Sequence, residues 1–314
     1  MKRVLSFISA IAVLVLAAGC NKQASVNPQD DVITASFTVS LPSGIATKAI
    51  SDGSQADELI FQAYDANLNH LDALDQTVAV SGKKATVNVT LVRGVSYTFV
   101  FWAQKQGKYA VSYDSNGHPV IEIKANDLPA MMNDDSYDAF YATVALGPQD
   151  GDVQQDITLK RPFAQINLGI SADDAQVATD NALNLADDLK TSFTIKGVNN
   201  SIDLLTGAAS GNNDVVYTAA VAPADTIVSE QVTYRRIGMV YVLAGTSQSV
   251  VDLTAAIQTK QSGSIDVNFT RAVPNVPVVR NYRTNIVGKV FSIGGTFNIQ
   301  VDADFATPDS QVDL

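Results

Sequence analysis

The sequence predicts an all-β fold of two tandem β-sandwiches, with one short helix in the second. Three observations lead to this prediction: apolar and polar residues alternate in short runs, clusters of Gly, Pro, Asn and Asp separate the runs, and a single segment has apolar residues at helical spacing. The 314 residues are 46% apolar and 17% charged, so the chain can bury a sizeable core. Its length corresponds to about two domains.

The first 19 residues are predicted to be a signal peptide. Lys2 and Arg3 precede an apolar run over residues 4–18, which is the order of an export signal. As a helix this run would span only about 22 Å, less than a hydrocarbon core of about 30 Å, so a permanent transmembrane helix is the weaker alternative. Residues 16–20, Leu-Ala-Ala-Gly-Cys, resemble a bacterial lipobox. We therefore expect lipid attachment at Cys20, with a plain signal peptide as the alternative, and a flexible tether over residues 20–31.

Residues 32–41 form the first predicted strand. Every second side chain is apolar: Ile33, Ala35, Phe37, Val39 and Leu41. Thr and Ser fill the positions between them, so we expect one buried and one exposed face. Strands are also predicted from residue 59, at 85–92 and at 95–103. The last is apolar on both faces from Tyr97 onward, which predicts a central strand covered on both sides.

The remaining segments continue the β pattern with one interruption. Further strands are predicted at residues 120–123, 140–146, 157–160, 163–170, 193–196, 202–205, 215–221, 237–244, 250–257, 265–269, 283–290 and 297–301. Residues 171–189 instead predict a helix or a helical turn, because apolar residues recur at helical spacing after Ser171, a plausible N-cap. About seven strands fall on each side of residue 159, which predicts domains at residues 32–158 and 159–314.

Composition excludes several classes of function. The net charge of -11 opposes binding of a polyanion, so we expect no nucleic-acid partner. One cysteine and two histidines cannot build the common zinc sites within one chain, and we expect neither a metal nor a cofactor. The sequence contains no G-x-S-x-G nucleophile elbow and no P-loop. A glycosidase needs only two suitably spaced carboxylates, which the sequence leaves open.

One motif resembles the start of a calcium-binding loop. Asp65, Asn67 and Asn69 have the spacing of its first three ligands. His70 and Gln76, however, stand where that loop needs a glycine and a bidentate glutamate. A hairpin turn is therefore the favoured interpretation.

Two other features have both a functional and a structural interpretation. Residues 81–84, Ser-Gly-Lys-Lys, match the S-x-x-K pattern of acyl-transferring enzymes, but they lie between two predicted strands as a hairpin loop would. The aromatic residues between Tyr97 and Trp102 could form a face that stacks on sugars, but a covered central strand explains them more simply.

Several motifs together resemble the fimbrillin family of surface lipoproteins, which build type V pili in Bacteroides-type bacteria. They are the lipobox at Cys20, Thr47-Lys48-Ala49, Lys160-Arg161-Pro162-Phe163-Ala164-Gln165-Ile166-Asn167, Ile202-Asp203-Leu204-Leu205-Thr206-Gly207, Tyr241-Val242-Leu243-Ala244 and Arg280-Asn281-Tyr282-Arg283-Thr284-Asn285-Ile286-x-Gly288. The resemblance covers most of the mature chain. It implies two transthyretin-like β-sandwiches and a structural or accessory subunit of a fimbria that mediates adhesion, not an enzyme.

The resemblance also implies sites and partners. Cys20 would carry the palmitate and the lipid anchor that hold the precursor at the cell outer membrane, facing the surface. A protease would cut after Lys48, where many relatives carry Arg, and free the first strand. The open groove would then accept a strand of another fimbrial subunit. Only residues 306–314 follow the last strand-like run, which is short for a donor strand. A tip or anchor subunit is therefore an alternative to a stalk subunit.

The alternative from a different class is a surface glycan-binding lipoprotein, in which exposed aromatic side chains hold the sugar. The exposure of Trp102 discriminates between the two, because a buried indole counts against a sugar platform. An enzyme is the third possibility, which a pair of facing carboxylates in a cleft would favour. The receptor is not revealed by the sequence.

Overall fold

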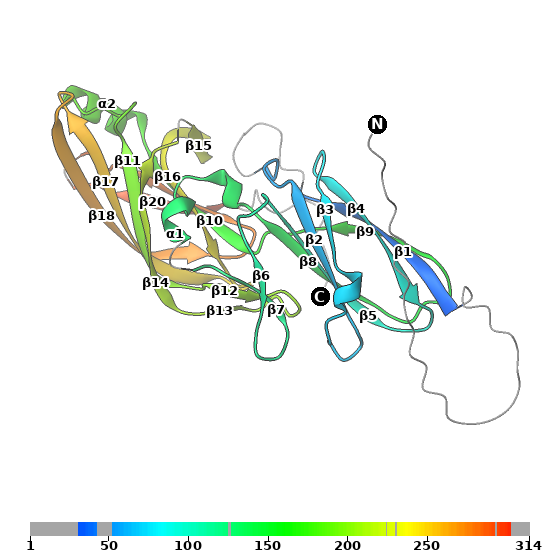
Figure 1. The fold of residues 1–314 in the computed structure, drawn as a ribbon. Helices are drawn as coiled ribbons and strands as arrows, with labels where there is room; N and C mark the ends of the chain where they lie inside the picture. The colour runs from blue at the N-terminus through cyan, green and yellow to red at the C-terminus, as the bar shows by residue number, and fades with distance from the viewer. Residues whose placement is uncertain are drawn as a thin grey trace, which may run out of the picture.

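The computed structural model describes residues 31–42, 52–124, 127–223, 225–229, 231–292 and 294–302 (Figure 1). Strands dominate these residues, and the two α-helices are short, which confirms the predicted all-β class. The strands form two lobes joined by a small third layer. The N-terminal lobe contains sheets A and B, the C-terminal lobe contains sheets D and E, and sheet C lies at their junction.

The N-terminal lobe is a sandwich of a three-stranded and a four-stranded sheet. Sheet A has the order β4-β1-β9 and consists of β1 (Val32–Ser40), β4 (Lys84–Val92) and β9 (Val153–Thr158). Sheet B has the order β3-β2-β5-β8 and consists of β2 (Glu58–Tyr64), β3 (Gln76–Ala79), β5 (Tyr97–Gln104) and β8 (Phe140–Leu146). A 3-10 turn at Asp72–Leu74 precedes β3.

The alternation of side chains explains the core of this lobe. Strands β1 and β4 bury every second residue, as their sequences predict, and these residues face the inner side of sheet B. Phe37 of β1 packs against Phe99 of β5, with 5.0 Å between ring centroids, and edge-on against Phe101 at 5.4 Å. The aromatic rings of β5 thus join the two sheets.

Strand β5 is covered on both faces, which confirms the prediction for a central strand. Phe99 and Phe101 belong to the N-terminal core, whereas Val100 and Trp102 belong to the second core. Sheet C, of order β13-β12-β7-β6, contributes to that second core. It consists of β6 (Val111–Tyr113), β7 (Pro119–Glu122), β12 (Ser201–Asp203) and β13 (Ala209–Ser210), and α1 (Leu128–Met131) and a 3-10 turn at Asp135–Tyr137 follow β7.

The C-terminal lobe contains one five-stranded and one four-stranded sheet. Sheet D has the order β15-β16-β10-β19-β20: β10 (Phe163–Ile170), β15 (Thr226–Ser229), β16 (Val232–Leu243), β19 (Arg283–Gly288) and β20 (Phe297–Asp302). Sheet E has the order β14-β11-β17-β18: β11 (Lys190–Val198), β14 (Asn213–Val221), β17 (Ser249–Gln261) and β18 (Ile265–Val278). Strand β10 is buried along its whole length because it is the central strand of sheet D.

The division of the chain at residue 159 stays a prediction. Strand β9 of sheet A ends at Thr158, and β10 of sheet D begins at Phe163. Sheet C, however, takes β6 and β7 from before residue 159 and β12 and β13 from after it. The second core therefore draws side chains from both predicted domains.

Helix α2 (Ala172–Asp180) begins where the sequence predicts and ends earlier than residue 189. The Ser171 hydroxyl caps it by accepting a hydrogen bond from the Asp174 amide at 3.2 Å. Ala182 then adopts a positive φ of 56°, which ends the helix. Leu185 and Leu189 are buried as expected, but in an irregular segment, so their helical spacing did not indicate helix.

An ion pair is fully buried at the lobe junction. The Arg161 Nε lies 2.9 Å and 3.0 Å from the two carboxylate oxygens of Asp138, and the guanidinium stacks on the Phe140 ring. Only 2% and 1% of the two charged side chains are exposed. Burial raises the pKa of Asp138 to about 6, while Arg161 acts in the opposite direction. Each ion has lost its hydration on burial, and its attraction to the other ion offsets that loss.

A second buried carboxylate fastens α2 to the β19–β20 connection. Asp174 accepts hydrogen bonds from the amides of Val290 at 2.6 Å, Phe291 at 3.0 Å and Ser292 at 3.0 Å. The Ser292 hydroxyl donates a fourth at 2.7 Å. From its place in the first turn of α2, Asp174 is expected to interact with the helix dipole only, so local sequence gives no signal for this structural role.

Replacing Asp138 with alanine should lower the free energy of unfolding by about 3–5 kcal/mol, because Arg161 would be left buried without its counter-ion. Urea denaturation measures the difference. The control is Lys105→Ala, which removes the exposed Lys105–Asp57 pair and should cost at most about 1 kcal/mol. Equal losses in the two variants would contradict the assignment.

Replacing Asp174 with alanine should cost at least about 3 kcal/mol, because three backbone amides would lose a charged acceptor. Hydrogen exchange should accelerate at residues 290–292. The matched control is Asp173→Ala, since Asp173 is exposed in the same helical turn and loses only the dipole interaction, about 0.3–1 kcal/mol. The assignment fails if exchange at residues 290–292 is unchanged in Asp174→Ala.

Candidate functional site

The strongest candidate site is strand β1 with the groove that it fills. Its five apolar side chains, Ile33, Ala35, Phe37, Val39 and Leu41, are each at most 4% exposed. On one side β1 pairs antiparallel with β4 along all nine residues. On the other side it pairs in parallel with β9, from Ala35 opposite Val153 to Ser40 opposite Thr158. This strand therefore contributes both a row of buried side chains and two ladders of backbone hydrogen bonds.

Strand β1 is the only link between the outer strands of sheet A within the described part of the chain. Neither β4 nor β9 pairs with any other named strand. Further bonds fix its two ends: the Thr34 amide donates to Asp152 at 2.8 Å, and the Leu41 amide donates to the Lys83 carbonyl at 2.9 Å. A groove of this depth needs a strand in it, because the Phe cluster of β5 would otherwise contact water.

The two predicted modification sites lie outside the described residues. Cys20 precedes residue 31, and Lys48 belongs to segment 43–51, which joins β1 to β2 along the chain. After this segment Lys83 pairs with Asp52 at 3.4 Å and donates to the Asp52 carbonyl oxygen. The lipid attachment and the cleavage stay predictions.

The predicted hairpin turn at Asp65 is confirmed. One Asp65 carboxylate oxygen accepts from the amides of Asn67 and Asn69, both at 2.8 Å, and Leu68 adopts a positive φ of 61°. His70, which follows the turn, lies 2.9 Å from the Asp75 carboxylate. The Asp65 carboxylate thus stabilises the turn through these hydrogen bonds.

The two other motifs have the structures that their structural interpretations predict. Ser81 and Lys84 exchange backbone hydrogen bonds around Gly82 and Lys83, which is the predicted hairpin loop. The Trp102 indole is fully buried and donates to Gln104 at 3.0 Å. By the criterion set above, this burial counts against a sugar platform at Trp102.

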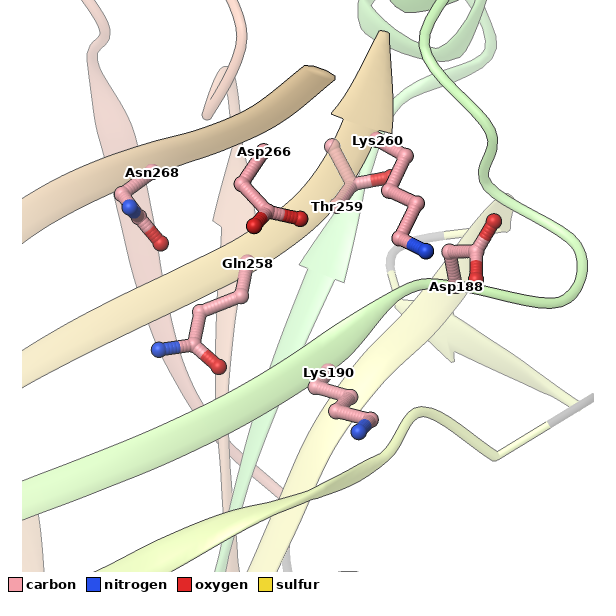
Figure 2. Close-up of a pocket in the computed structure, with 7 residues that line it drawn as sticks. All are labelled: Asp188, Lys190, Gln258, Thr259, Lys260, Asp266 and Asn268. Carbon is pink, nitrogen blue, oxygen red and sulfur yellow. The ribbon is translucent and has the colours of Figure 1, made fainter. Parts of the chain in front are cut away.

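A shallow polar pocket of about 330 Å³ lies on the exposed face of sheet E (Figure 2). Figure 2 shows side chains from β11, β17 and β18 around it, with Lys260 directed toward Asp188. Lys190 and Asp266 complete the charged lining. Two cations against two carboxylates leave no net charge, and no aromatic ring lines the pocket, so it is a weak candidate for a ligand site.

The described residues contain neither a cluster of metal-ligating side chains nor a membrane-spanning helix. No group of three or more His, Cys, Asp or Glu side chains is arranged to hold a metal ion. No helix there has the length and apolar character needed to cross a bilayer.

Solved structures of three proteins from Bacteroides share this fold. A candidate adhesin from Bacteroides thetaiotaomicron VPI-5482 has a TM-score of 0.54 at 13% identity, over 89% of this chain and 98% of that chain. A candidate cell adhesion protein from Bacteroides uniformis ATCC 8492 has a TM-score of 0.52 at 12% identity, over 89% of this chain and 100% of that chain. A candidate adhesin from Bacteroides ovatus has a TM-score of 0.51 at 11% identity, over 88% of this chain and 94% of that chain.

These similarities extend over both lobes and support the all-β sandwich fold. No curated protein matches the sequence. One family model does, and it spans residues 27–313, which is nearly the whole chain. The protein therefore belongs to the family of unknown function DUF6562.

Proposed function

We propose that the protein is a non-enzymatic adhesin subunit of a cell-surface fimbria, held at the outer membrane by lipid on Cys20. We further propose that cleavage after Lys48 frees β1 and that a strand of a neighbouring subunit replaces it. The observation that carries this proposal is the position of β1: it lies in the middle of sheet A, yet it is the first strand of the described residues. The adhesion-related names of the Bacteroides structures agree with it.

The connectivity of β1 makes a single cut sufficient. Along the chain β1 is joined to the other described strands through residues 41–57. After cleavage at Lys48, non-covalent contacts alone would hold it against these strands. A strand with described strands on both sides along the chain would need two cuts to leave, so the position of β1 suits replacement.

The energetics favour refilling of the groove. The four larger buried side chains of β1 contribute about 6–12 kcal/mol of gross burial, as an upper range. If β1 left, β9 and β4 would each lose the one strand that pairs with them within the described residues. A strand with the same alternation, antiparallel to β4, would restore both ladders and the apolar contacts. A replacing strand therefore recovers what the departure of β1 costs and joins two subunits in the same step.

Limited trypsin treatment of the lipid-free precursor should cut first at Lys48 and give oligomer ladders that dissociate on heating. Lys48→Ala should resist both the cut and the oligomerisation, whereas Lys84→Ala, at an exposed lysine of β4, should behave as the unchanged protein. Gel electrophoresis without boiling and mass spectrometry of the fragments give the readout. Clean cutting that leaves only monomers would rule out strand exchange.

The same assay tests β1 itself. Phe37→Ala should make the binding of β1 in its groove about 3–5 kcal/mol less favourable. The oligomer ladders should therefore appear faster after the cut. Val32→Ala is the matched control, because Val32 lies on the same strand and is 38% exposed. Equal rates for the two variants would contradict displacement of β1 as the assembly step.

Replacement of Cys20 by serine should move the protein from the detergent phase to the aqueous phase in a phase-partition experiment, because the acyl chains supply the membrane affinity. The fold should not change, since the tether precedes β1. Equal partitioning of the variant and the unchanged protein would refute the lipid anchor.

A further inference from the structure

A cleft of about 780 Å³ lies between the lobes and has no assigned role. On one side it is lined by β8 and β9 of the N-terminal lobe. On the other side it is lined by residues 205–207, between β12 and β13 of sheet C, and by Thr246 and Arg280 of the C-terminal lobe. This volume is in the range of sites that hold small ligands, including a mono- or disaccharide.

Two diverging strands open the cleft. The Tyr141 amide donates to the Lys160 carbonyl at 2.9 Å, and the Lys160 amide donates back at 3.0 Å. Beyond this bridge, among the described strands, β8 pairs only with β5, and β9 only with β1. Thr143 of β8 and Asp156 and Thr158 of β9 therefore line the open space instead of facing each other across a ladder.

Arg280 gives the cleft a positive charge that no described carboxylate neutralises. Its guanidinium donates to the Tyr141 hydroxyl at 2.6 Å, the Gly207 carbonyl at 2.7 Å and the Ala244 carbonyl at 3.1 Å. All three acceptors are neutral, and no ion pair involves Arg280 within the described ranges. Three bonds use three of its five N–H donors. The exposed Lys160 adds a second cation at the same cleft.

Gly207 allows the close approach of these groups. A Cβ at this position would lie 2.7 Å from the Tyr141 hydroxyl oxygen and 3.4 Å from an Arg280 nitrogen. The positive φ of 70° also suits glycine. Because the Tyr141 oxygen accepts from Arg280, its own hydrogen is available to a ligand. Burial raises the pKa of Tyr141, against the influence of Arg280, so the phenol keeps that hydrogen at neutral pH.

The remaining lining suits a ligand with many hydroxyl groups. Threonine side chains surround the cleft at positions 98, 143, 158, 206 and 246, and Asp156 offers a carboxylate acceptor. A threonine hydroxyl can both donate and accept, as a sugar hydroxyl can. Thr143 already donates to the Leu204 carbonyl and can still accept, and Thr206 already accepts from the Ala208 amide at 3.2 Å and can accept once more. The charged lining of the cleft, Arg280, Lys160 and Asp156, has a net charge of +1, although the whole chain carries a net charge of -11.

We propose that this cleft binds an acidic sugar of the uronic acid class. Arg280 and Lys160 hold the sugar carboxylate, Tyr141 donates to a ligand oxygen, and Asp156 with the threonines binds the ring hydroxyls. The assignment goes beyond the proposed function, because it needs neither cleavage at Lys48 nor replacement of β1.

The test is isothermal titration of the full chain in detergent with methyl α-D-galacturonide and, in parallel, methyl α-D-galactoside. The two probes differ by the carboxylate, so the galacturonide should bind and the galactoside should bind at least about tenfold more weakly. Absence of galacturonide binding, or equal affinity for both probes, would overturn the proposal.

Variants connect the binding to the cleft. Lys160→Gln should weaken galacturonide binding about tenfold, because a charged hydrogen bond is lost while the exposed position spares the fold. Lys84→Gln removes an exposed lysine elsewhere and should leave the affinity unchanged. Arg280→Lys keeps the charge but loses the planar donors and should also bind more weakly, with circular dichroism to verify folding. Equal affinities of Lys160→Gln and Lys84→Gln would refute the site.

Discussion

The burial of β5 on both faces is the constraint on which the rest of the structure depends. Its alternate side chains belong to different cores: Phe99 and Phe101 pack inside the N-terminal sandwich, and Val100 and Trp102 pack toward sheet C and the C-terminal lobe. Each lobe would expose a large apolar surface without this strand. The aromatic residues that could suggest a sugar platform are thus the contact between two cores, and this packing explains the buried indole.

Polar groups at the junction add specificity to this apolar contact. Asp138 and Arg161 are charged and almost completely buried, so their pairing stabilises one arrangement of the connection between sheets A and D and penalises others. Asp174 acts similarly at the other end of the C-terminal lobe, where it accepts hydrogen bonds from three backbone amides of the turn before β20. Hydrophobic packing tolerates small shifts, whereas such bonds do not.

The strand proposed for assembly and the cleft proposed for ligand binding lie at different places in the molecule. Strand β1 occupies the middle of sheet A, while the cleft opens where the edge strands β8 and β9 diverge. Strand β9 belongs to both, since it pairs with β1 on one side and lines the cleft on the other. An adhesin that polymerises through β1 would therefore present the cleft beside each subunit contact, with the lobes held by the junction described above.

The sequence by itself determined the local features. The two-residue period over 32–41 and 85–92, the double apolar face of β5, the turn at Asp65 and the Ser171 cap each depend on residues that are neighbours in the chain. Cys20 and Lys48 were also found by sequence alone, and they stay predictions because they lie outside the described residues.

The tertiary structure decided what depends on distant segments. The parallel pairing of β1 with β9, the bond from Val290 to Asp174 across 116 residues and the bond from Arg280 to Tyr141 across 139 residues have no signal in local spacing. The end of α2 is a further example, because Leu185 and Leu189 have helical spacing but are buried outside the helix. Periodicity reports which side of an element is apolar, whereas partners are selected by how the whole chain packs and by which buried polar groups find acceptors.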